Sequence, residues 1–381
     1  MKQSEFQIGG KAVGGASSRV YVVAEIGINH GGSCTEAKRL IDAAAKCGAD
    51  AVKFQTFHAD RLLVASQERY GQQEPGAESA YEMFHRLELS WDDHRELKLY
   101  ADSRGIQFFS TPFDEESVDQ LDALGVPVFK IASADITHVP LLRCVASKGK
   151  PILLSTGMSY LQEVTAAAEV LRGAGAQQIM LLHCVSSYPA SREELNLRAI
   201  STLRRQLDLP VGYSDHSQGI LAALLAAALG AVLIEKHFTL DRDAVGPDHK
   251  LSMDPAELRD LVQNLRVVEK ILGNGLKSPS DTEIESRALS RRSIVAAVDI
   301  QAGAQIRPEM LTFKRPGTGL APGDLDRVVG MIARQSIRAD SLLQLNDLAP
   351  APQAKSEFSG RMACTAFNGL LPPVAEDKFH G

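Results

Sequence analysis

The sequence predicts an α/β fold in which a (β/α)8 TIM barrel is followed by a smaller β-rich domain. Between Tyr21 and about Leu272, short apolar and β-branched runs alternate with amphipathic or Ala/Leu-rich runs. Eight such strand–helix units over about 250 residues match the size and rhythm of this barrel. An open, doubly wound sheet is the alternative, but unbroken alternation with equally apolar first and last strands favours closure. No glycine-rich dinucleotide motif or P-loop follows a strand, so neither of those folds is supported.

The apolar runs define the expected strands, which are residues 21–28, 51–56, 107–111, 128–132, 151–156, 179–184, 211–213 and 231–235. The intervening runs define the expected helices, which are residues 35–47, 91–104, 115–124, 139–147, 162–172, 197–206, 218–229 and 255–272. One helix starts with Asp254 before Pro255, and several end at a glycine such as Gly48 or Gly125. These start and stop signals agree with the periodicity.

The pattern changes after Gly273, and this change divides the chain. The expected parts are an N-terminal extension (1–20), the barrel (21–273), a polar linker (274–290), a second domain (291–349) and a disordered tail (350–381). The second domain consists of short β-like runs between Pro and Gly turns, too small and too β-rich to extend the barrel. Residues 58–89 form a polar connection that is much longer than an ordinary link between a strand and a helix. We therefore expect a functional loop over the barrel mouth.

Charge and cysteine content exclude several classes of protein. A formal net charge of -6 argues against a nucleic-acid binder. The five cysteines form no CxxC pair, which suits a reducing compartment and does not support a zinc–thiolate site. The N-terminal stretch has no apolar signal-peptide core, and the apolar run 220–234 is shorter than the roughly 20 residues of a membrane span. We therefore expect a cytoplasmic protein that engages neither nucleic acid nor membrane.

The stretch from Val211 to Phe238 organises the predicted site. Its two apolar strands end in the polar clusters SDH and EKH, and a short apolar helix separates them. If the strands are parallel neighbours, His216 and His237 lie side by side at one rim of the sheet. Two imidazoles placed in this way can hold a divalent metal.

The other strands also end in polar residues, at the end of a barrel where active sites form. Lys53 and Lys130 lie inside otherwise apolar strands, and a buried ammonium is costly unless an anion partners it. With hydroxyl groups nearby, these lysines predict a pocket for phosphate and carboxylate groups. The strand-end hydroxyl residues include Ser110, Thr111, Ser133, Ser155, Thr156, Ser186, Ser187 and Ser214. Together with the metal, the pocket implies a small phosphorylated acid and a carbonyl that the metal polarises.

Three further polar residues allow two interpretations each. Glu25 follows an apolar run and is either a functional carboxylate or the structural ion-pair partner of Lys53. His30 is either a ligand or substrate contact or a loop histidine bonded to the backbone. His183 ends a buried strand and is either functional or a satisfied core histidine.

A series of motifs carries a resemblance to a known family: YVVAEIGINHGG, AVKFQTF, FFSTPFD, VFKIASADI, ILLSTGMS, LLHCVSSYP, GYSDHS, EKHFTLDRDAVGPDH and KRPGTGL. They resemble the sialic acid synthase family, which comprises N-acetylneuraminate synthase and its legionaminate and pseudaminate relatives. The match runs in order from about Tyr21 to Leu348 and covers both domains.

The resemblance implies a barrel fused to a C-terminal antifreeze-like (SAF) domain. It also implies a domain-swapped homodimer in which each small domain closes the partner's barrel mouth. The implied reaction condenses phosphoenolpyruvate (PEP) with N-acetylmannosamine or a related N-acylated sugar, giving a sialic-acid-type nonulosonic acid and phosphate. The implied cofactor is a divalent metal on His216 and His237, with Mn2+ expected and Mg2+ or Co2+ as alternatives.

The resemblance also implies residue roles. Glu25 would act in proton transfer or charge stabilisation beside the reacting enol carbon or the attacking water, with Lys53, His216 and His237 completing the catalytic set. The implied PEP-binding residues are Lys53, Thr111, Lys130, Ser133, Ser155, Ser186 and Ser214. The implied sugar-binding residues are Gln55, Asp135, Tyr188, Asp248 and Arg315, the last supplied by the partner's small domain.

Three departures from the family pattern leave the sugar open. Gln72 or Gln73 is the nearest candidate for the family's sugar-binding asparagine in the long loop. Ser186 stands where N-acetylneuraminate enzymes tend to carry Asn, and Asp135 stands where Glu is usual. A legionaminate-type synthase using 2,4-diacetamido-2,4,6-trideoxymannose is therefore the alternative.

Two alternatives come from other functional classes. One is a metal-dependent aldolase that uses pyruvate, and the other is a non-catalytic barrel whose small domain binds carbohydrate or ice. The presence of Glu25, both lysines and both histidines argues against the non-catalytic barrel, whereas product formation from pyruvate without PEP would distinguish the aldolase.

Overall fold

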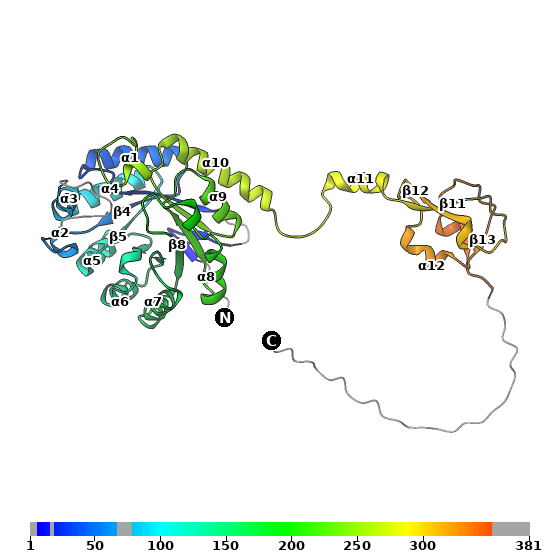
Figure 1. Cartoon of the computed structure of the whole chain (residues 1–381), viewed down its shortest axis with the longest axis horizontal. Coiled ribbons are helices and arrows are strands. Elements are labelled where there is room, and N and C mark those ends of the chain that lie inside the picture. Colours follow the sequence, from blue (N-terminus) through cyan, green and yellow to red (C-terminus); the bar gives the residue numbers. More distant parts are fainter. Residues whose placement is uncertain (1–5, 16–18, 67–77, 353–381) are drawn as a thin grey trace, which may run out of the picture. The chain divides into compact units, whose positions relative to one another are not determined.

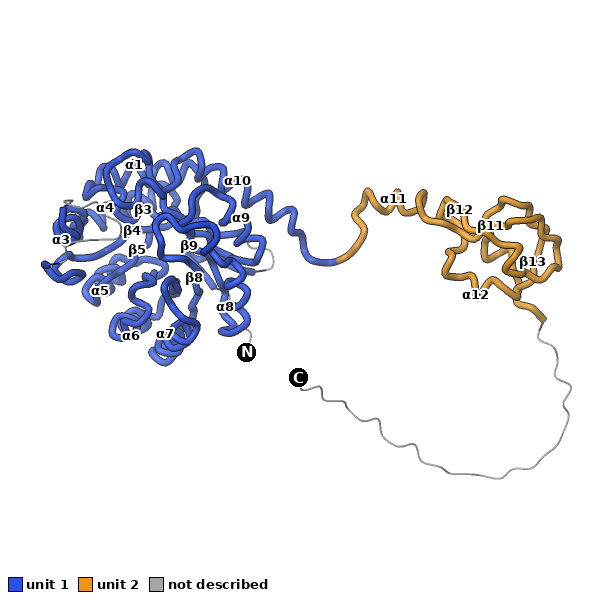
Figure 2. Tube along the Cα trace, viewed as in Figure 1, with its two compact units in different colours: residues 1–276 blue, residues 277–381 orange. Residues whose placement is uncertain are grey.

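The computed structural model of the chain describes residues 6–15, 19–66 and 78–352. The chain divides into two units, residues 1–276 and residues 277–381 (Figure 2). Most of the expected tail, from residue 353 onward, lies outside the described residues, as do Gln72 and Gln73.

A parallel sheet of eight strands forms the centre of the first unit. The strands are β3 (Tyr21–Gly27), β4 (Ala51–Thr56), β5 (Gln107–Pro112), β6 (Phe129–Ile131), β7 (Ile152–Ser155), β8 (Ile179–Cys184), β9 (Val211–Asp215) and β10 (Leu233–His237). Their order in the sheet is β5-β4-β3-β10-β9-β8-β7-β6. β3, which comes first among these strands in the sequence, therefore pairs with β10, which comes last. β5 and β6, at the two ends of this order, pack against each other. The predicted (β/α)8 barrel is confirmed.

Helices follow the strands and surround the sheet (Figure 1). They are α1 (Cys34–Cys47), α4 (Trp91–Ser103), α5 (Glu115–Leu124), α6 (Val139–Ser147), α7 (Leu161–Gly173), α8 (Ala199–Leu207), α9 (Leu221–Ala228) and α10 (Pro255–Leu272). In α1, Ala37, Leu40, Ile41 and Ala44 face the barrel at helical spacing. No helix in the described ranges is long and apolar enough to cross a membrane.

Strands β9 and β10 extend two residues further at their carboxyl ends than the sequence predicts. The polar residues that appeared to end each strand continue the ladder instead, with Glu235 paired to Ser214 and Lys236 paired to Asp215. Each of these cross-strand pairs also has a side-chain contact. The polar groups of the two strands satisfy one another, so the strands continue into the barrel mouth.

The N-terminal segment contains a hairpin that the sequence did not predict, formed by β1 (Phe6–Ile8) and β2 (Lys11–Val13). Its apolar side chains belong to the barrel core. The backbone N–H of Gln7 donates to the side chain of Gln178, which directly precedes β8. The hairpin therefore lies at the amino ends of the barrel strands, and the carboxyl ends remain available for a site.

The long connection after β4 contains two helices in its described part, α2 (Ala59–Leu62) and α3 (Ala80–Leu87). A separate apolar cluster holds them, in which the ring of Phe57 packs edge-on against Phe84. Ile28, which directly follows β3, belongs to the same cluster. The connection is thus packed onto the loops at the carboxyl ends of β3 and β4.

The second unit has its own apolar core, which includes Ile294, Val328 and Leu343. Its elements are α11 (Asp281–Ser290), β11 (Ser293–Ala296), β12 (Leu311–Lys314), α12 (Leu325–Val328), β13 (Ile332–Ala333) and β14 (Leu348–Ala349). β11 pairs with β12 and β13 pairs with β14, both antiparallel.

Helix α11 lies in the segment 274–290, where the sequence predicted a polar linker and no helix. The Ser280 side chain accepts from the Glu283 backbone N–H, and the Glu283 carboxylate accepts in return from that of Ser280. Ser280 and Glu283 form the S-x-x-E pattern of a capping box, but the polar composition of the segment led us to predict a linker there.

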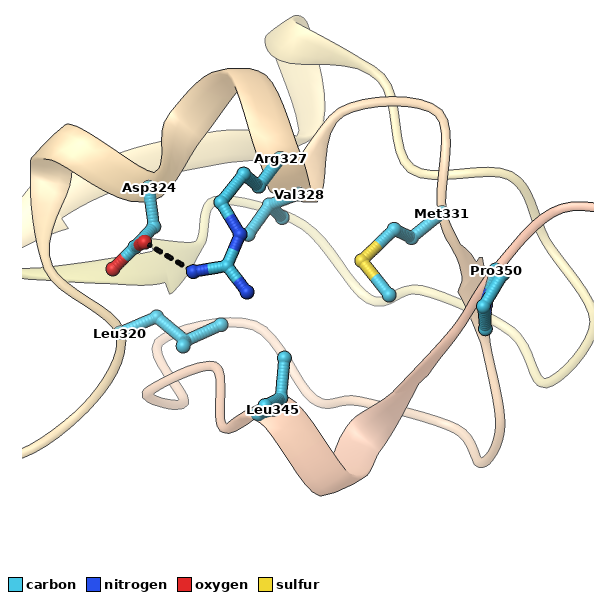
Figure 3. Close-up of a pocket in the computed structure, with 7 residues that line it drawn as sticks. All are labelled: Leu320, Asp324, Arg327, Val328, Met331, Leu345 and Pro350. Carbon is cyan, nitrogen blue, oxygen red and sulfur yellow. Dashed lines mark hydrogen bonds and ion pairs between the residues drawn. The ribbon is translucent and has the colours of Figure 1, made fainter.

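A cavity of about 300 Å³ lies within the second unit (Figure 3). Its apolar walls include Leu320, Met331 and Leu345, and Arg327 lies at its edge in an ion pair with Asp324. None of the candidate catalytic residues lines this cavity.

Candidate active site

Four buried charged residues form one cluster at the carboxyl ends of the barrel strands. Lys53 Nζ lies 2.9 Å from Glu25 Oε2 and 3.8 Å from Glu235 Oε1. Lys130 Nζ lies 2.9 Å from the same Glu235 oxygen. No side chain in the cluster is more than 4% exposed. Two ammonium groups and two carboxylates thus balance each other where water is largely excluded.

The strand geometry explains why these groups converge. Glu25 pairs in register with Lys53 on one side and with His237 on the other, so three functional side chains stand in one row. Because side chains alternate along a strand, Glu235 and His237 share the inward face of β10. β3 bulges between Glu25 and Gly27, and Gly27 has a φ of +53°, a conformation that glycine adopts without strain.

The two carboxylates of the cluster have opposite pKa shifts. Burial raises the pKa of Glu25 to about 7, and the nearby ammonium of Lys53 offsets only part of that effect. Burial acts on Glu235 in the same direction, but Lys130 and Lys53 outweigh it and bring its pKa down to about 2. Near neutral pH, Glu235 is therefore a permanent anion, whereas Glu25 can gain or lose a proton.

Several hydroxyl groups lie at the carboxyl ends of the same strands, and two of them bond to the charged cluster. Lys53 donates to Thr111 Oγ1 at 3.1 Å, and Ser214 Oγ donates to Glu235 at 2.9 Å. Ser133 Oγ accepts from the backbone N–H of Gly157 at 3.0 Å. Ser155 is buried at the end of β7.

Gly157 packs where no larger residue fits. A Cβ atom there would lie 2.3 Å from Ser186 Oγ and 2.9 Å from Ser133 Oγ. The absence of a side chain therefore lets the backbone N–H of Gly157 approach a group of serine hydroxyls, as in sites that bind oxyanions.

The two predicted metal ligands lie together, with ring centroids 5.5 Å apart. His216 Nδ1 bonds to the carbonyl oxygen of Val185 at 2.7 Å, which orients the ring and leaves Nε2 available. Burial lowers the pKa of His216 to about 4, and burial together with the neighbouring His216 lowers that of His237 well below its usual value. Both imidazoles are therefore neutral at physiological pH, the state that binds metals.

The residues at this point fit a divalent cation. His237 Nδ1 is buried without a hydrogen-bond partner, which is costly unless a ligand completes its coordination. Asp248 Oδ2 lies 3.6 Å from that nitrogen and adds a carboxylate to the two imidazoles.

A second group with metal-ligand spacing lies on the barrel exterior and consists of Cys34, Asp93 and Glu96. Burial and the neighbouring Glu96 raise the pKa of the Cys34 thiol to about 11, and Lys38 already pairs with Glu96. A protonated thiol is a poor ligand.

The predicted sugar contacts in the barrel lie around the same centre. Gln55 Nε2 donates to Glu25 at 3.3 Å, and the ring centroids of Tyr188 and His216 are 4.3 Å apart. Asp135 Oδ2 is buried without a hydrogen-bond partner, and burial raises the pKa of this carboxyl to about 6, as it does for Asp248. Arg315 belongs to the second unit, where its side chain is exposed.

The two ambiguous histidines both bond to the backbone. His30 Nδ1 accepts from the N–H of Gly32 at 3.0 Å, and His183 Nε2 bonds to the carbonyl oxygen of Leu195 at 2.8 Å. These contacts agree with the structural interpretation of each.

Sequence reasoning missed Glu235 and Gly157 as members of the site. Glu235 stands two positions before His237 in a strand, so side-chain alternation alone was a signal that both face inward. Gly157 carried no such signal, because its importance depends on serines from two other loops.

The fold and this geometry define a class: a parallel barrel with a buried cluster of two lysines and two carboxylates beside a pair of neutral histidines. The sequence matches the NeuB family over residues 40–277 and the SAF domain over residues 291–349. The chain belongs to the NeuB family.

Individual relatives agree with this assignment. The chain is 47% identical to an N,N'-diacetyllegionaminic acid synthase of Legionella pneumophila, over 89% of this chain and 98% of that protein. It is 43% identical to a synthase of the same name from Campylobacter jejuni, over 86% and 99% of the two chains. The crystal structure of an N-acetylneuraminic acid synthetase from Leptospira borgpetersenii is 37% identical and superposes with a TM-score of 0.69, covering 74% of this chain and 95% of that one. The predicted family and enzyme class, a synthase, are confirmed.

Proposed function

We propose that this protein condenses PEP with an N-acylated mannosamine-type sugar to form a nonulosonic acid and phosphate. One observation carries the proposal: two buried lysines, two carboxylates of opposite pKa shift and two neutral histidines converge at one end of the barrel. The lysines suit the anionic substrate PEP, and the histidines suit a metal that polarises the aldehyde of the sugar.

PEP would be held by its phosphate and carboxylate groups. The proposed contacts are Lys53, Thr111, Lys130, Ser133, Ser155, Ser186 and Ser214. Without substrate, Glu235 accepts from Lys130 and Ser214. We infer that Glu235 keeps these donors charged and oriented until the substrate anion arrives.

His216 and His237 would hold the divalent cation, with Asp248 beside them; Mn2+ is the proposed ion, and Mg2+ and Co2+ are alternatives. When bound, the cation would supply Lewis-acid polarisation of the sugar aldehyde. Gln55, Asp135 and Tyr188 would orient the sugar so that its carbonyl carbon faces C3 of PEP.

Glu25 would serve in proton transfer. Attack of C3 on the aldehyde leaves positive charge at C2 of PEP, which an adjacent carboxylate stabilises. Attack also turns the aldehyde oxygen into an alkoxide, which needs a proton. Water then adds at C2 and loses a proton, which Glu25, with a pKa of about 7, can accept and pass to that alkoxide. Collapse of the tetrahedral intermediate breaks the bond between C2 and the phosphate oxygen and releases phosphate.

A legionaminate-type substrate is the second candidate. The two relatives at 47% and 43% identity both carry the name N,N'-diacetyllegionaminic acid synthase. Asp135 is one methylene shorter than the glutamate usual in N-acetylneuraminate enzymes, and we infer that it would suit a different sugar substituent. The proposed alternative substrate is 2,4-diacetamido-2,4,6-trideoxymannose.

The assay for these proposals measures phosphate release from PEP with each sugar, with and without Mn2+. Release is expected only when PEP, sugar and metal are all present, and higher kcat/KM for one sugar identifies the substrate. Product formation from pyruvate in place of PEP would support an aldolase and contradict the proposal. His216→Ala/His237→Ala is expected to abolish turnover, whereas the matched surface variant His85→Ala is not.

We further propose a cytoplasmic homodimer in which Arg315 of one chain reaches the N-acyl group of a sugar bound in the partner's barrel. Chains carrying His216→Ala and chains carrying Arg315→Ala, each inactive alone, are then expected to recover part of the activity when mixed and reassembled. A failure of mixed dimers to recover activity would indicate a site completed within one chain.

A further inference from the structure

A buried ion pair lies behind the two histidines, on the outer face of the same pair of strands. Lys236 Nζ is 2.7 Å from Asp215 Oδ2, and the two side chains are 1% and 0% exposed. They are cross-strand partners in the β9–β10 ladder. Because side chains alternate along a strand, the neighbouring pair Ser214 and Glu235 meets inside the barrel mouth, and Lys236 and Asp215 meet on the opposite face.

The hydrogen bonds of this pair reach both sides of His216. Lys236 Nζ also donates to the carbonyl oxygen of Ser217 at 2.5 Å. Asp215 Oδ1 accepts from the backbone N–H of Ser217 at 2.8 Å and from its hydroxyl at 2.6 Å. Asp215 and Ser217 directly precede and follow His216, and Lys236 directly precedes His237. One ammonium group therefore links the backbone at both histidines.

Stability alone is a weak explanation for such a pair. Removing two charges from water is costly, and well-packed apolar residues often replace a buried ion pair without loss of stability. A fixed geometry is the better-supported benefit. Here Tyr213 OH also donates to Asp215 at 3.2 Å, so hydrogen bonds from three residues hold the carboxylate in place.

We propose that Lys236 and Asp215 are positioning residues, which hold His216 and His237 at the separation and orientation that a divalent cation requires. The inference rests on the metal-binding role proposed for the two histidines. Partners that orient metal ligands from behind typically change metal affinity 10- to 100-fold when removed. The Kd for Mn2+ is expected to rise about tenfold or more when the ion pair is lost.

The experiment measures Mn2+ binding to the full-length, metal-free protein without substrates, by electron paramagnetic resonance of free Mn2+. The variants are Lys236→Met, Asp215→Asn/Lys236→Met and Ser217→Ala. The double variant leaves no buried charge unpaired, so it preserves the fold more readily than Lys236→Met. The matched control is Arg266→Met, which breaks the ion pair with Glu269 near Val20, before the amino end of β3.

The expected result is a Kd at least about tenfold higher in the double variant, with a Tm near that of the native protein and an unchanged Kd in Arg266→Met. A native Kd in the folded double variant would overturn the proposal. If neither charge variant folds, Ser217→Ala decides: measurably weaker Mn2+ binding supports the positioning role, and native binding overturns it.

A parallel measurement on His216→Ala/His237→Ala separates this inference from the function on which it rests. Loss of Mn2+ binding there supports the metal assignment whatever the ion-pair variants do. Native Mn2+ affinity in that variant would overturn the metal assignment itself.

Discussion

Replacing Glu235 with glutamine tests the electrostatic interpretation of the barrel mouth most directly. Glu235 is the partner of Lys130 at 2.9 Å, and both side chains are 4% exposed. With a pKa of about 2, Glu235 is fully ionised at neutral pH, so Glu235→Gln removes one whole negative charge. Lys130 is then left as a buried cation without its anion.

The expected loss follows from the burial of this pair. Removing one partner of a buried ion pair costs about 3–5 kcal/mol in the free energy of unfolding. At about 2 °C per kcal/mol for a domain of this size, the Tm of the barrel falls by about 6–10 °C. Glu25→Gln is the control within the same cluster. The pKa of Glu25 is about 7, so only part of the Glu25 population is charged at neutral pH, and Lys53 still has Glu235 as an anionic neighbour in this variant. We therefore expect Glu25→Gln to lower the Tm at neutral pH by less than half as much as Glu235→Gln.

The assay is thermal unfolding of metal-free protein with and without inorganic phosphate. If the lysines form an anion pocket, phosphate replaces the missing carboxylate and raises the Tm of Glu235→Gln more than that of the native protein. An unchanged Tm in Glu235→Gln, or an equal response to phosphate in both proteins, would refute the interpretation.

Two further predictions concern the histidines and the glycine of the site. The pKa of His216 is about 4 in the folded protein and near its ordinary 6.5 in the unfolded chain. Between these two pH values the unfolded chain binds a proton that the folded protein does not. The free energy of unfolding is therefore highest above pH 6.5 and decreases as the pH falls from 6.5 to 4. Urea unfolding of the metal-free protein at pH 7.5 and 4.5 is expected to show an acid destabilisation roughly 2–3 kcal/mol larger in the native chain than in His216→Asn. Equal losses in the two proteins would contradict this prediction. Gly157→Ala places a Cβ atom 2.3 Å from Ser186 Oγ, one of the proposed PEP contacts. We expect KM for PEP to rise at least about tenfold, which corresponds to roughly 1.4 kcal/mol of binding free energy, with little change in KM for the sugar. An unaltered KM for PEP would exclude the Gly157 loop from the PEP site.

The alternation of apolar strands and amphipathic helices was sufficient to predict most of the barrel. Hydrophobic periodicity depends on local burial, and expected boundaries such as 115–124 and 139–147 coincide with α5 and α6. The N-terminal hairpin was missed because a strand of three residues is too short for a pattern. Helix α11 was missed because it lacks an apolar face, and none of its residues is buried.

Some residues of the candidate site could be predicted from the sequence, and others could not. His216, His237, Lys53 and Lys130 could be proposed from sequence, because charged or imidazole groups at the ends of apolar strands need a reason to be there. Glu235 was overlooked because only the histidine of the EKH cluster was given a role, although Glu235 and Lys236 are both buried as well.

The sequence by itself determined the type and order of the elements, the family and the residue types at the strand ends, since these depend on neighbours along the chain. Only the tertiary structure decided which charges meet. Closure of β3 against β10 places Glu25 beside His237, residues more than two hundred positions apart, and the shared Glu235 joins Lys53 to Lys130. The pKa values follow from the same closure, because burial and the distances between charges exist only in the folded barrel.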